Sequence, residues 1–498
     1  MKRRQILLNA VTTIAQTLGN AVLLFFLYRF LIRSIGVDRL GIWSLVLATT
    51  SVITLANQGF STSIVKFVAK YAARESAEEV AAVLQTAVIS AVIGVGLVSA
   101  GLYPIARWIL HLVLPATRLA EAQAILPLAI VSLGITILEG VLQAGLAGHQ
   151  LITVCNYLDL GGGLSYLALA IAFVPAHGLL GLAYAQATQG VALLAITWWL
   201  LRRRVPALPL LPRRWNRALF RELGGYGVHF QLITSAQALR EPVTKALIAR
   251  FGGLAMTAFY DLAARWVFTL RELAVQANQV LIPTVSHFQE SDPKLIPLVY
   301  RKSYRLIFFL AVPTFACAAV LGPVVSRVWI GRYEAAFVEF VAILAAGWLA
   351  NVLANPAYTV DLGTGALKWV SVGCAAAAVL NAGLGLMAGK LFGALGVVAA
   401  TAISQTVGYG IVVVAYHVEN HTSFRLLLPT ESRGLLLASL GGALILLPVL
   451  CSTDARHSAT FGTAAAGAAA LMVALLKLMW VHPMRRELFR WVREQVPV

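Results

Sequence analysis

Charged residues are scarce in this sequence. Only 12% of the 498 residues are Asp, Glu, Lys or Arg, whereas 59% are apolar, and the mean hydropathy is +0.80. A soluble domain carries about a quarter of its residues as charges. The shortage therefore excludes an ordinary soluble protein of this length, which would have several domains joined by polar loops.

Acidic residues are the scarcer kind of charge. The 21 Asp and Glu face 39 Lys and Arg, which gives a formal net charge of +18. Such an excess can indicate nucleic-acid binding, but here the basic residues form short clusters between apolar runs and no nucleic-acid-binding motif accompanies them. Membrane orientation and anionic lipid headgroups account for such clusters, so we expect membrane lipids as partners and no nucleic acid.

Catalytic and metal-binding motifs are also missing. The four cysteines are scattered without a CxxC pair or a Cys/His cluster, which indicates neither a disulfide framework nor a metal site. No HExxH, GxSxG or P-loop motif occurs. We therefore expect a protein that is not an enzyme and has no cofactor, and any driven transport has to use an ion gradient or the gradient of the substrate.

Apolar runs of about twenty residues recur along the whole chain, and each can cross roughly 30 Å of hydrocarbon as a helix. The sequence predicts an all-α integral membrane protein of about fourteen transmembrane helices. We expect these at residues 6–32, 41–63, 81–103, 122–147, 150–174, 178–201, 226–250, 256–282, 303–330, 336–358, 366–388, 392–416, 434–451 and 459–481.

The positions of the basic residues predict the orientation. With the N-terminus in the cytoplasm, and with residues near a helix end counted with the adjoining loop, 25 of the 39 Lys and Arg fall on the cytoplasmic side, nine on the other side and five deeper within the helices. Cytoplasmic loops of membrane proteins carry such an excess of Lys and Arg. We expect both termini in the cytoplasm and only short loops on the opposite side.

An internal repeat divides the chain. A shift of about 216 residues places Arg29 on Lys245 and Gly36 on Gly252, and a shift of 215 places 178–181 on 393–396, both of which begin and end with glycine. Six helices per copy give both copies the same orientation, so they should pair about a pseudo-twofold axis along the membrane normal. The expected parts are a six-helix lobe 1–201, a basic cytoplasmic linker 202–221, a six-helix lobe 222–418, and helices 13 and 14 with a basic tail at 419–498.

Charged and polar residues inside the expected helices are candidates for function, because a charge in a membrane costs roughly 2.5–3.5 kcal/mol on insertion scales. One face of helix 226–250 carries a polar stripe, and so does one face of helix 256–282. The simplest interpretation pairs Glu241 with Lys245 and Asp261 with Arg265 at i,i+4, which is compatible with lining a cavity. The stripes consist of Thr234, Gln237, Glu241 and Lys245, and of Asp261, Arg265, Glu272, Gln276 and Gln279.

Arg29 has no acid on its own helix. As the repeat partner of Lys245 it can face that residue across a central cleft and hold an anion, or it can extend to the membrane interface. It also lies on the opposite side of its helix from a polar stripe of Asn9, Thr13, Gln16 and Asn20.

Further acids in or beside the helices are candidate ion or proton sites, although packing hydrogen bonds would explain them equally well. Together with Glu241, Asp261 and Glu272, these are Glu139 with its neighbour Gln143, Asp159 near Asn156, and Asp361.

Three segments resemble the Wzx-type polysaccharide flippases of the multidrug/oligosaccharidyl-lipid/polysaccharide exporter superfamily. They are residues 34–44 (SIGVDRLGIWS), 57–71 (NQGFSTSIVKFVAKY) and 146–150 (LAGHQ). The resemblance extends over essentially the whole chain through its plan of six, six and two helices.

The resemblance implies a bacterial inner-membrane protein. Such a protein flips undecaprenyl-diphosphate-linked oligosaccharide from the cytoplasmic to the periplasmic leaflet by alternating access, for O-antigen, lipopolysaccharide or exopolysaccharide synthesis. It also implies H+ or Na+ as coupling ion and polysaccharide polymerase or chain-length proteins as partners. Residue type and position then place Arg29, Lys245, Arg265 and Arg271 near the diphosphate, with Gln237 and Gln276 as further substrate contacts.

Two alternatives remain open at this point. A MATE-like exporter of organic cations has the same architecture, but many such proteins use a buried acid in the first helix, where this chain has Arg29 and no acid. An integral-membrane polymerase or ligase would predict a large periplasmic loop, whereas the expected loops are short.

Overall fold

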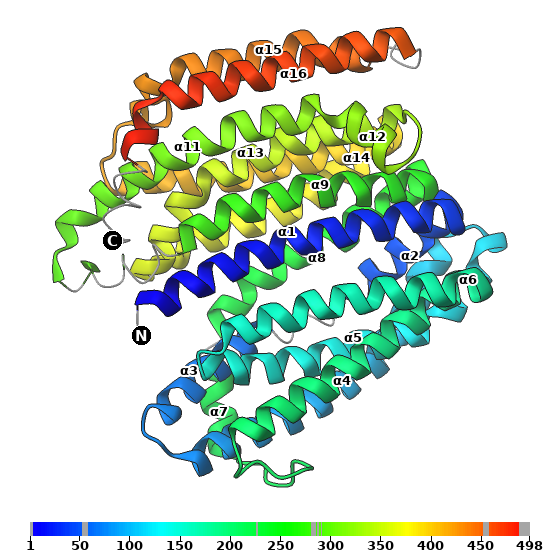
Figure 1. The fold of residues 1–498 in the computed structure, drawn as a ribbon, viewed down its shortest axis with the longest axis vertical. Helices are drawn as coiled ribbons and strands as arrows, with labels where there is room; N and C mark the ends of the chain where they lie inside the picture. Colours follow the sequence, from blue (N-terminus) through cyan, green and yellow to red (C-terminus); the bar gives the residue numbers. More distant parts are fainter. Residues whose placement is uncertain are drawn as a thin grey trace. The chain divides into compact units, whose positions relative to one another are not determined.

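The computed structural model describes residues 3–51, 58–225, 228–279, 285, 288–289, 291–451 and 458–487 (Figure 1). Within these residues every regular element is a helix. Helix is found in the described part of all fourteen expected ranges, which confirms the all-α membrane architecture. The chain divides into two compact units, Met1–Ala258 and Phe259–Val498.

The first unit is built around a pair of long neighbouring helices, α5 and α6, with α4 beside α5 and α1 beside α6. Its side chains pack into an apolar core that includes Leu84 and Leu201. Its helices are α1 (Arg3–Ser34), α2 (Gly36–Thr50), α3 (Gln58–Ala72), α4 (Ala77–Val113), α5 (Ala116–Gly148), α6 (Ile152–Arg204), α7 (Arg217–Gly225) and α8 (Val228–Gly252).

Helix α6 is a hairpin of two antiparallel arms. Its 53 residues would extend about 80 Å as one straight helix, far more than a bilayer. The chain instead reverses at Gly178, whose φ of 57° and ψ of −129° suit only glycine. The arms then pack closely, because a Cβ on Gly162 would lie 2.6 Å from Leu193 Cδ1 and one on Gly181 would lie 2.3 Å from the carbonyl oxygen of Phe173.

The second unit repeats this hairpin in α14 (Leu367–Glu419). The chain reverses at Gly393, with φ 61° and ψ −144°, and a Cβ on Gly396 would lie 2.2 Å from the carbonyl oxygen of Ala388. Gly393 and Gly396 are the residues that a shift of 215 aligns with Gly178 and Gly181. The repeat detected in the sequence is therefore present in the backbone geometry.

The repeat differs by one residue at the first turn of each copy. Gly36 has a φ of +81° after α1, and the glycine of similar φ after α8 is Gly253 (+85°), not Gly252. The shift measured at these two turns is thus 217 residues, where the sequence alignment used 216.

The other elements of the second unit also follow the expected ranges, with one difference. Helix 303–330 was expected to be continuous, but it begins earlier and breaks at Leu321, because Pro323 cannot donate a backbone hydrogen bond to the preceding turn. The helices are α9 (Leu254–Gln279), which begins just before the boundary between the units, α11 (Ile296–Val320), α12 (Gly322–Trp329), α13 (Ala335–Thr364), α15 (Arg433–Cys451) and α16 (Ser458–Val481), with short 3-10 turns at Pro293–Leu295, Phe424–Leu427 and Thr430–Ser432.

The last two helices, α15 and α16, lie side by side and pack on α11 (Figure 1). Polar contacts hold the segment that precedes α15 and the end of α16 to α11. Arg305 of α11 pairs with Glu431 and, at 3.5 Å, with Glu487. The hydroxyl of Ser432 lies 3.1 Å from His482 Nε2.

The expected linker 202–221 is ordered against the first unit. The backbone N–H groups of Arg213 and Arg214 donate to Gln85 Oε1 of α4 at 3.1 and 3.3 Å. Trp215 Nε1 donates to Ser90 at 3.0 Å. Two polar residues in an apolar helix, Gln85 and Ser90, thus fix the path of the chain between α6 and α7.

The compact units divide at Ala258, whereas the lobes expected from the sequence divide at the linker. Helix α8, expected in the second lobe, packs against α2, α3 and α4 of the first unit. The lobe division at 202–221 stays a prediction.

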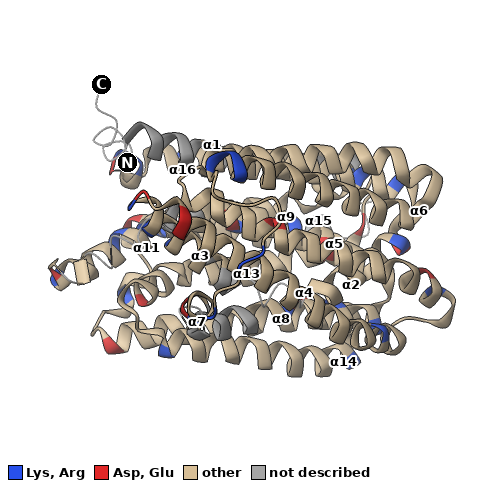
Figure 2. Ribbon diagram, turned by 90° about the horizontal axis from the view of Figure 1, so that it is seen from below, with Lys and Arg blue, Asp and Glu red and all other residues tan. Residues whose placement is uncertain are grey.

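The helix surfaces are apolar, as lipid requires. Leu97, Val379 and Leu391 are 71–74% exposed. Charged residues are few along the length of the long helices (Figure 2). Seven of the described helices, including both hairpins, are long and apolar enough to cross a membrane. The few charges that lie inside the helices of the membrane domain, α8 and α9 included, are therefore the first candidates for function.

Candidate functional site

A polar cluster lies inside the first unit, where α1, α5 and both arms of α6 meet. Its centre is Gln143 of α5, whose Nε2 donates to Glu139 Oε1 at 2.7 Å and to Asp159 Oδ1 at 2.8 Å. Gln16 of α1 donates to the second oxygen of Asp159 at 3.3 Å. The hydroxyl of Thr197, on the second arm of α6, donates to Glu139 Oε1 at 3.2 Å. One amide thus bridges two carboxyl groups.

The cluster continues along α1. Asn156 Nδ2 donates to the hydroxyls of Thr12 and Thr13, both at 3.0 Å. Farther along the helix, Asn20 Oδ1 is buried and has no hydrogen-bond partner among the described residues. The polar stripe expected on the first helix therefore faces the acids of α5 and α6. The side chain of Asn9, the first member of the stripe, lies outside the described residues.

The chemistry of this cluster suits a small hard cation or a proton. It supplies carboxylate, amide and hydroxyl oxygens, which are the ligands of hard cations. The thiol of Cys155, beside the cluster, donates to the carbonyl oxygen of Gln143 at 3.7 Å. Among the described residues, no group of three His, Cys, Asp or Glu is arranged to hold a metal ion. The two acids come from different helices and share one donor, so a movement of α5 against α6 would change both.

Helix α8 contains the first of the expected ion pairs. Lys245 Nζ lies 2.8 Å from Glu241 Oε1, one turn away, and the lysine side chain is only 4% exposed whereas the glutamate is 60% exposed. The simple i,i+4 interpretation is confirmed for this pair. Gln237, one turn earlier, is half-buried, as is Arg29 of α1. The side chain of Thr234 lies outside the described residues.

Helix α9 contains the second pair. Asp261 is buried and accepts a hydrogen bond from Arg265 Nε at 3.0 Å, which confirms the second i,i+4 pairing. The guanidinium of Arg265 is one-third exposed, so the pair reaches from the core toward the surface of its unit.

Arg271 of α9 is held on several sides. Its guanidinium lies 5.4 Å from the ring centre of Phe268 and 5.3 Å from that of Trp348 on α13. Its Nε donates to Asn351 Oδ1 at 3.1 Å, and its Nη1 contacts Glu272. A fixed guanidinium of this kind presents a planar donor edge, which matches phosphate geometry.

Trp348 and Asn351 were missed in the sequence. A signal existed, since Asn351 is a polar residue within a largely apolar helix, but nothing in the sequence placed it against Arg271. Gln276, expected beside these residues, and Gln279 belong to α9, and their side chains lie outside the described residues.

Asp361 lies apart, near the end of α13. It is 8% exposed and within electrostatic range of Tyr300 and Tyr416, whose ring centres are 4.3 Å apart. Tyr300 also bonds His417 Nε2 at 2.8 Å. The structure therefore brings the candidate residues together in separate groups: Glu139 with Asp159, Glu241 with Lys245, Asp261 with Arg265, Arg271 with Glu272, and Asp361 among aromatic side chains.

Known structures share this architecture. An inward-facing multidrug resistance MATE family transporter of the MOP superfamily has a TM-score of 0.68 and 14% identity, over 83% of this chain and 96% of that one. The lipid II flippase MurJ, in an inward closed conformation, has a TM-score of 0.66 and 11% identity, over 97% of this chain and all of the other. A MATE transporter of Vibrio cholerae gives 0.62 and 15%, over 85% and 99%. At these identities the likeness shows the fold.

The family is shown by sequence. No curated protein matches this chain. The family model described as "Polysaccharide biosynthesis protein" matches residues 30–339, which is more than half of the sequence. This match confirms the resemblance to the polysaccharide flippases: the chain belongs to the polysaccharide biosynthesis protein family.

Proposed function

We propose that this protein flips undecaprenyl-diphosphate-linked oligosaccharide repeat units from the cytoplasmic to the periplasmic leaflet of a bacterial inner membrane, by alternating access. The observation that carries the proposal is the family match over residues 30–339 of a helical membrane transporter fold. The neighbour named as a lipid II flippase acts on a lipid-linked substrate, which supports the same class of substrate here.

The cations of α1, α8 and α9 are the proposed contacts of the diphosphate. Arg29, Lys245, Arg265 and Arg271 would supply positive charge, with Gln237 and Gln276 for the sugar hydroxyls. Among these, Arg271 has the most defined geometry, because Asn351 and two aromatic rings hold it.

The acids beside these cations have a role in the same scheme. Glu241, Asp261 and Glu272 each lie next to one cation. A cation left alone in a membrane is costly, so an acid neighbour stabilises it while no substrate is bound. A diphosphate would then take over part of that pairing and release an exposed acid such as Glu241.

We place the coupling ion, H+ or Na+, at the polar cluster of Glu139, Gln143 and Asp159. The cluster supports this role because two carboxyl groups and several hydroxyls converge in one membrane-buried place. Asp361 is a second candidate site. Both termini are proposed to be cytoplasmic, and a polysaccharide polymerase or chain-length protein would act on the product.

The experiment is a deletion of the gene in its host, followed by an assay of lipid-linked oligosaccharide in each leaflet. We expect the oligosaccharide to accumulate on the cytoplasmic side and surface polysaccharide to be lost. Arg271→Ala should fail to restore export at normal expression. Arg425→Ala should restore it, because Arg425 is an exposed residue in the loop that follows α14.

Other outcomes would contradict the proposal. Unchanged glycan together with new sensitivity to cationic dyes would favour a drug exporter. Oligosaccharide that reaches the outer leaflet but is not polymerised would favour a polymerase or ligase.

A further inference from the structure

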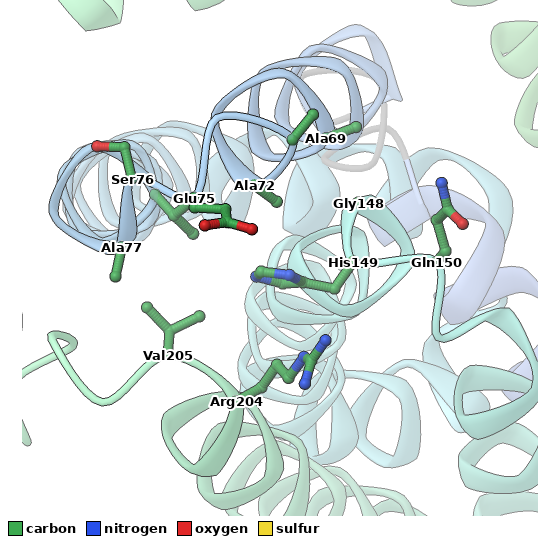
Figure 3. A pocket seen from close by; sticks show the side chains of 12 residues that line it. Ala69, Ala72, Glu75, Ser76, Ala77, Gly148, His149, Gln150, Arg204 and Val205 are labelled. Carbon is green, nitrogen blue, oxygen red and sulfur yellow. The ribbon is translucent and has the colours of Figure 1, made fainter. Parts of the chain in front are cut away.

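A cavity of about 370 Å³ lies in the first unit, where α3, α5 and α6 end and α4 begins (Figure 3). Small side chains of α3, such as Ala72, form one wall, and Val205 forms part of another. Its volume lies in the range of small-ligand pockets. The residues of the Glu139–Asp159 cluster do not line it, and the transport proposal assigns it no role.

Besides Ser76, four polar side chains line this cavity: Glu75, His149, Gln150 and Arg204. Within the part of the chain that the structure describes, none of the four has a hydrogen bond or ion pair through its side chain. Figure 3 shows the carboxylate of Glu75 and the ring of His149 pointing toward one another, with the guanidinium of Arg204 on the other side of the ring. His149 Nε2 is also shielded from solvent and has no partner among the described residues.

The backbone holds two of these residues in an unusual conformation. Glu75 has a φ of 55° and Gln150 a φ of 63°, which non-glycine residues seldom adopt. Each lies in a tight turn between two helices, α3 to α4 and α5 to α6. Both turns therefore place a polar side chain at the rim of the same cavity at some cost in backbone energy.

The charges around the cavity are of both signs. Arg204 attracts an anion. The backbone N–H groups in the first turn of α4 strengthen this attraction, because helix N-termini leave N–H groups without intrahelical acceptors. The side chain of Ser76, at the N-cap, makes no capping hydrogen bond to them. Glu75 attracts a cation instead. A simple anion would be repelled by Glu75 and a simple cation by Arg204, so a group that carries both charges fits best.

His149 supports this arrangement without adding a charge. Burial, and then the nearby Arg204, lower the pKa of its imidazole below the ordinary value, so the ring is neutral at pH 7. A neutral imidazole can donate or accept one hydrogen bond.

We propose that this cavity binds a zwitterionic group made of a phosphate ester and a primary amine. Arg204 and the first turn of α4 take the phosphate, Glu75 takes the ammonium, and His149 and Gln150 complete the hydrogen bonds. The group can belong to the headgroup of phosphatidylethanolamine or to a soluble phosphoethanolamine ester.

The test titrates the purified full-length protein in detergent with phosphatidylethanolamine, phosphatidylglycerol or phosphatidylcholine of the same chain length. Native mass spectrometry reads the occupancy. In a parallel arm, O-phosphoethanolamine is added to the lipid-bound protein. If it displaces the lipid, the natural ligand is a soluble ester; if it does not, the ligand is a lipid headgroup. Arg204→Ala and Glu75→Gln test the site. Arg203→Ala and Glu222→Gln are matched controls, since Arg203 stacks on Trp199 at 3.8 Å, Glu222 is exposed on α7, and neither residue lines the cavity.

We expect phosphatidylethanolamine to bind at least about tenfold more tightly than the other two lipids, and each site variant to lose about tenfold, because a charge-assisted contact is removed. The controls should bind as the unchanged protein does. Equal binding of phosphatidylglycerol would overturn the proposal, and so would equal losses in the site and control variants. Because Glu75→Gln keeps the size of the side chain, its result stands even if Arg204→Ala folds poorly.

Discussion

Replacing Gln143 with Met should destabilise the protein and uncouple transport. Methionine keeps the approximate size of glutamine but cannot donate, so Glu139 and Asp159 lose donors at 2.7 and 2.8 Å. Removing one partner of a buried hydrogen bond to a charged group costs about 1–3 kcal/mol. Both acids are half-buried and keep a second donor, Thr197 or Gln16. The expected total is therefore about 2–4 kcal/mol.

A double-mutant cycle tests the cause of this loss. We would measure unfolding in mixed micelles for Gln143→Met, for Glu139→Gln with Asp159→Asn, and for the three changes together. If the amide acts through the two carboxyl groups, the cost of Gln143→Met should fall below about 1 kcal/mol once they are neutral. An equal cost in both backgrounds would refute the reasoning, because it would mean that packing alone explains Gln143.

Three further predictions concern the fold. Gly178→Ala should destabilise the protein by about 1–3 kcal/mol, because the backbone at this position has a positive φ. Gly161→Ala, whose new Cβ meets open space in a helix, should instead stabilise it by about 0.5–1 kcal/mol. Thermal unfolding compares the two variants, and equal midpoints would contradict the hairpin. Gln85→Ala should release the segment after α6, which limited proteolysis would detect as new cleavage between 205 and 216, and unchanged protection would argue against the anchor. His482 Nδ1 accepts a hydrogen bond from the N–H of Met484 at 3.2 Å, and burial lowers the pKa of the ring, so protonation favours the unfolded chain. The stability of the protein should therefore fall as the pH drops below about 6.5. A His482→Gln protein with the same pH profile of stability would contradict this.

Much of the fold was predictable, because a membrane imposes strong rules on sequence. Apolar run length predicted the helices, and two glycine pairs at a constant spacing indicated the repeat, whose hairpin turns the structure places at Gly178 and Gly393. The break at Leu321 was missed although Pro323 stands beside it, since proline at the start of a helix and proline inside one look alike in an apolar run.

Many residues of the candidate site stand out in the sequence, but their arrangement does not. Local pairs such as Glu241 with Lys245 follow from helical periodicity, which the sequence contains. The bridge from Glu139 through Gln143 to Asp159 needs α5 and the first arm of α6 to meet in one register. The contact of Arg271 with Asn351 joins residues 80 positions apart. No periodicity encodes such contacts, because they depend on how helices pack.

The acids beside the proposed diphosphate contacts differ in how far they are exposed, and this difference predicts different roles. In the structure Glu241 is 60% exposed while its partner Lys245 is buried, so the acid is the member of the pair that can leave. Asp261 is the opposite case, since the acid is buried and Arg265 is the exposed member. An arriving anion would therefore displace Glu241 from Lys245, whereas it would bind Arg265 without displacing Asp261. We expect Glu241→Gln to tighten substrate binding and Asp261→Asn mainly to lower the stability of the protein. Binding of lipid-linked substrate to the two purified variants would separate these roles, and equal effects on affinity would show that the acids act alike.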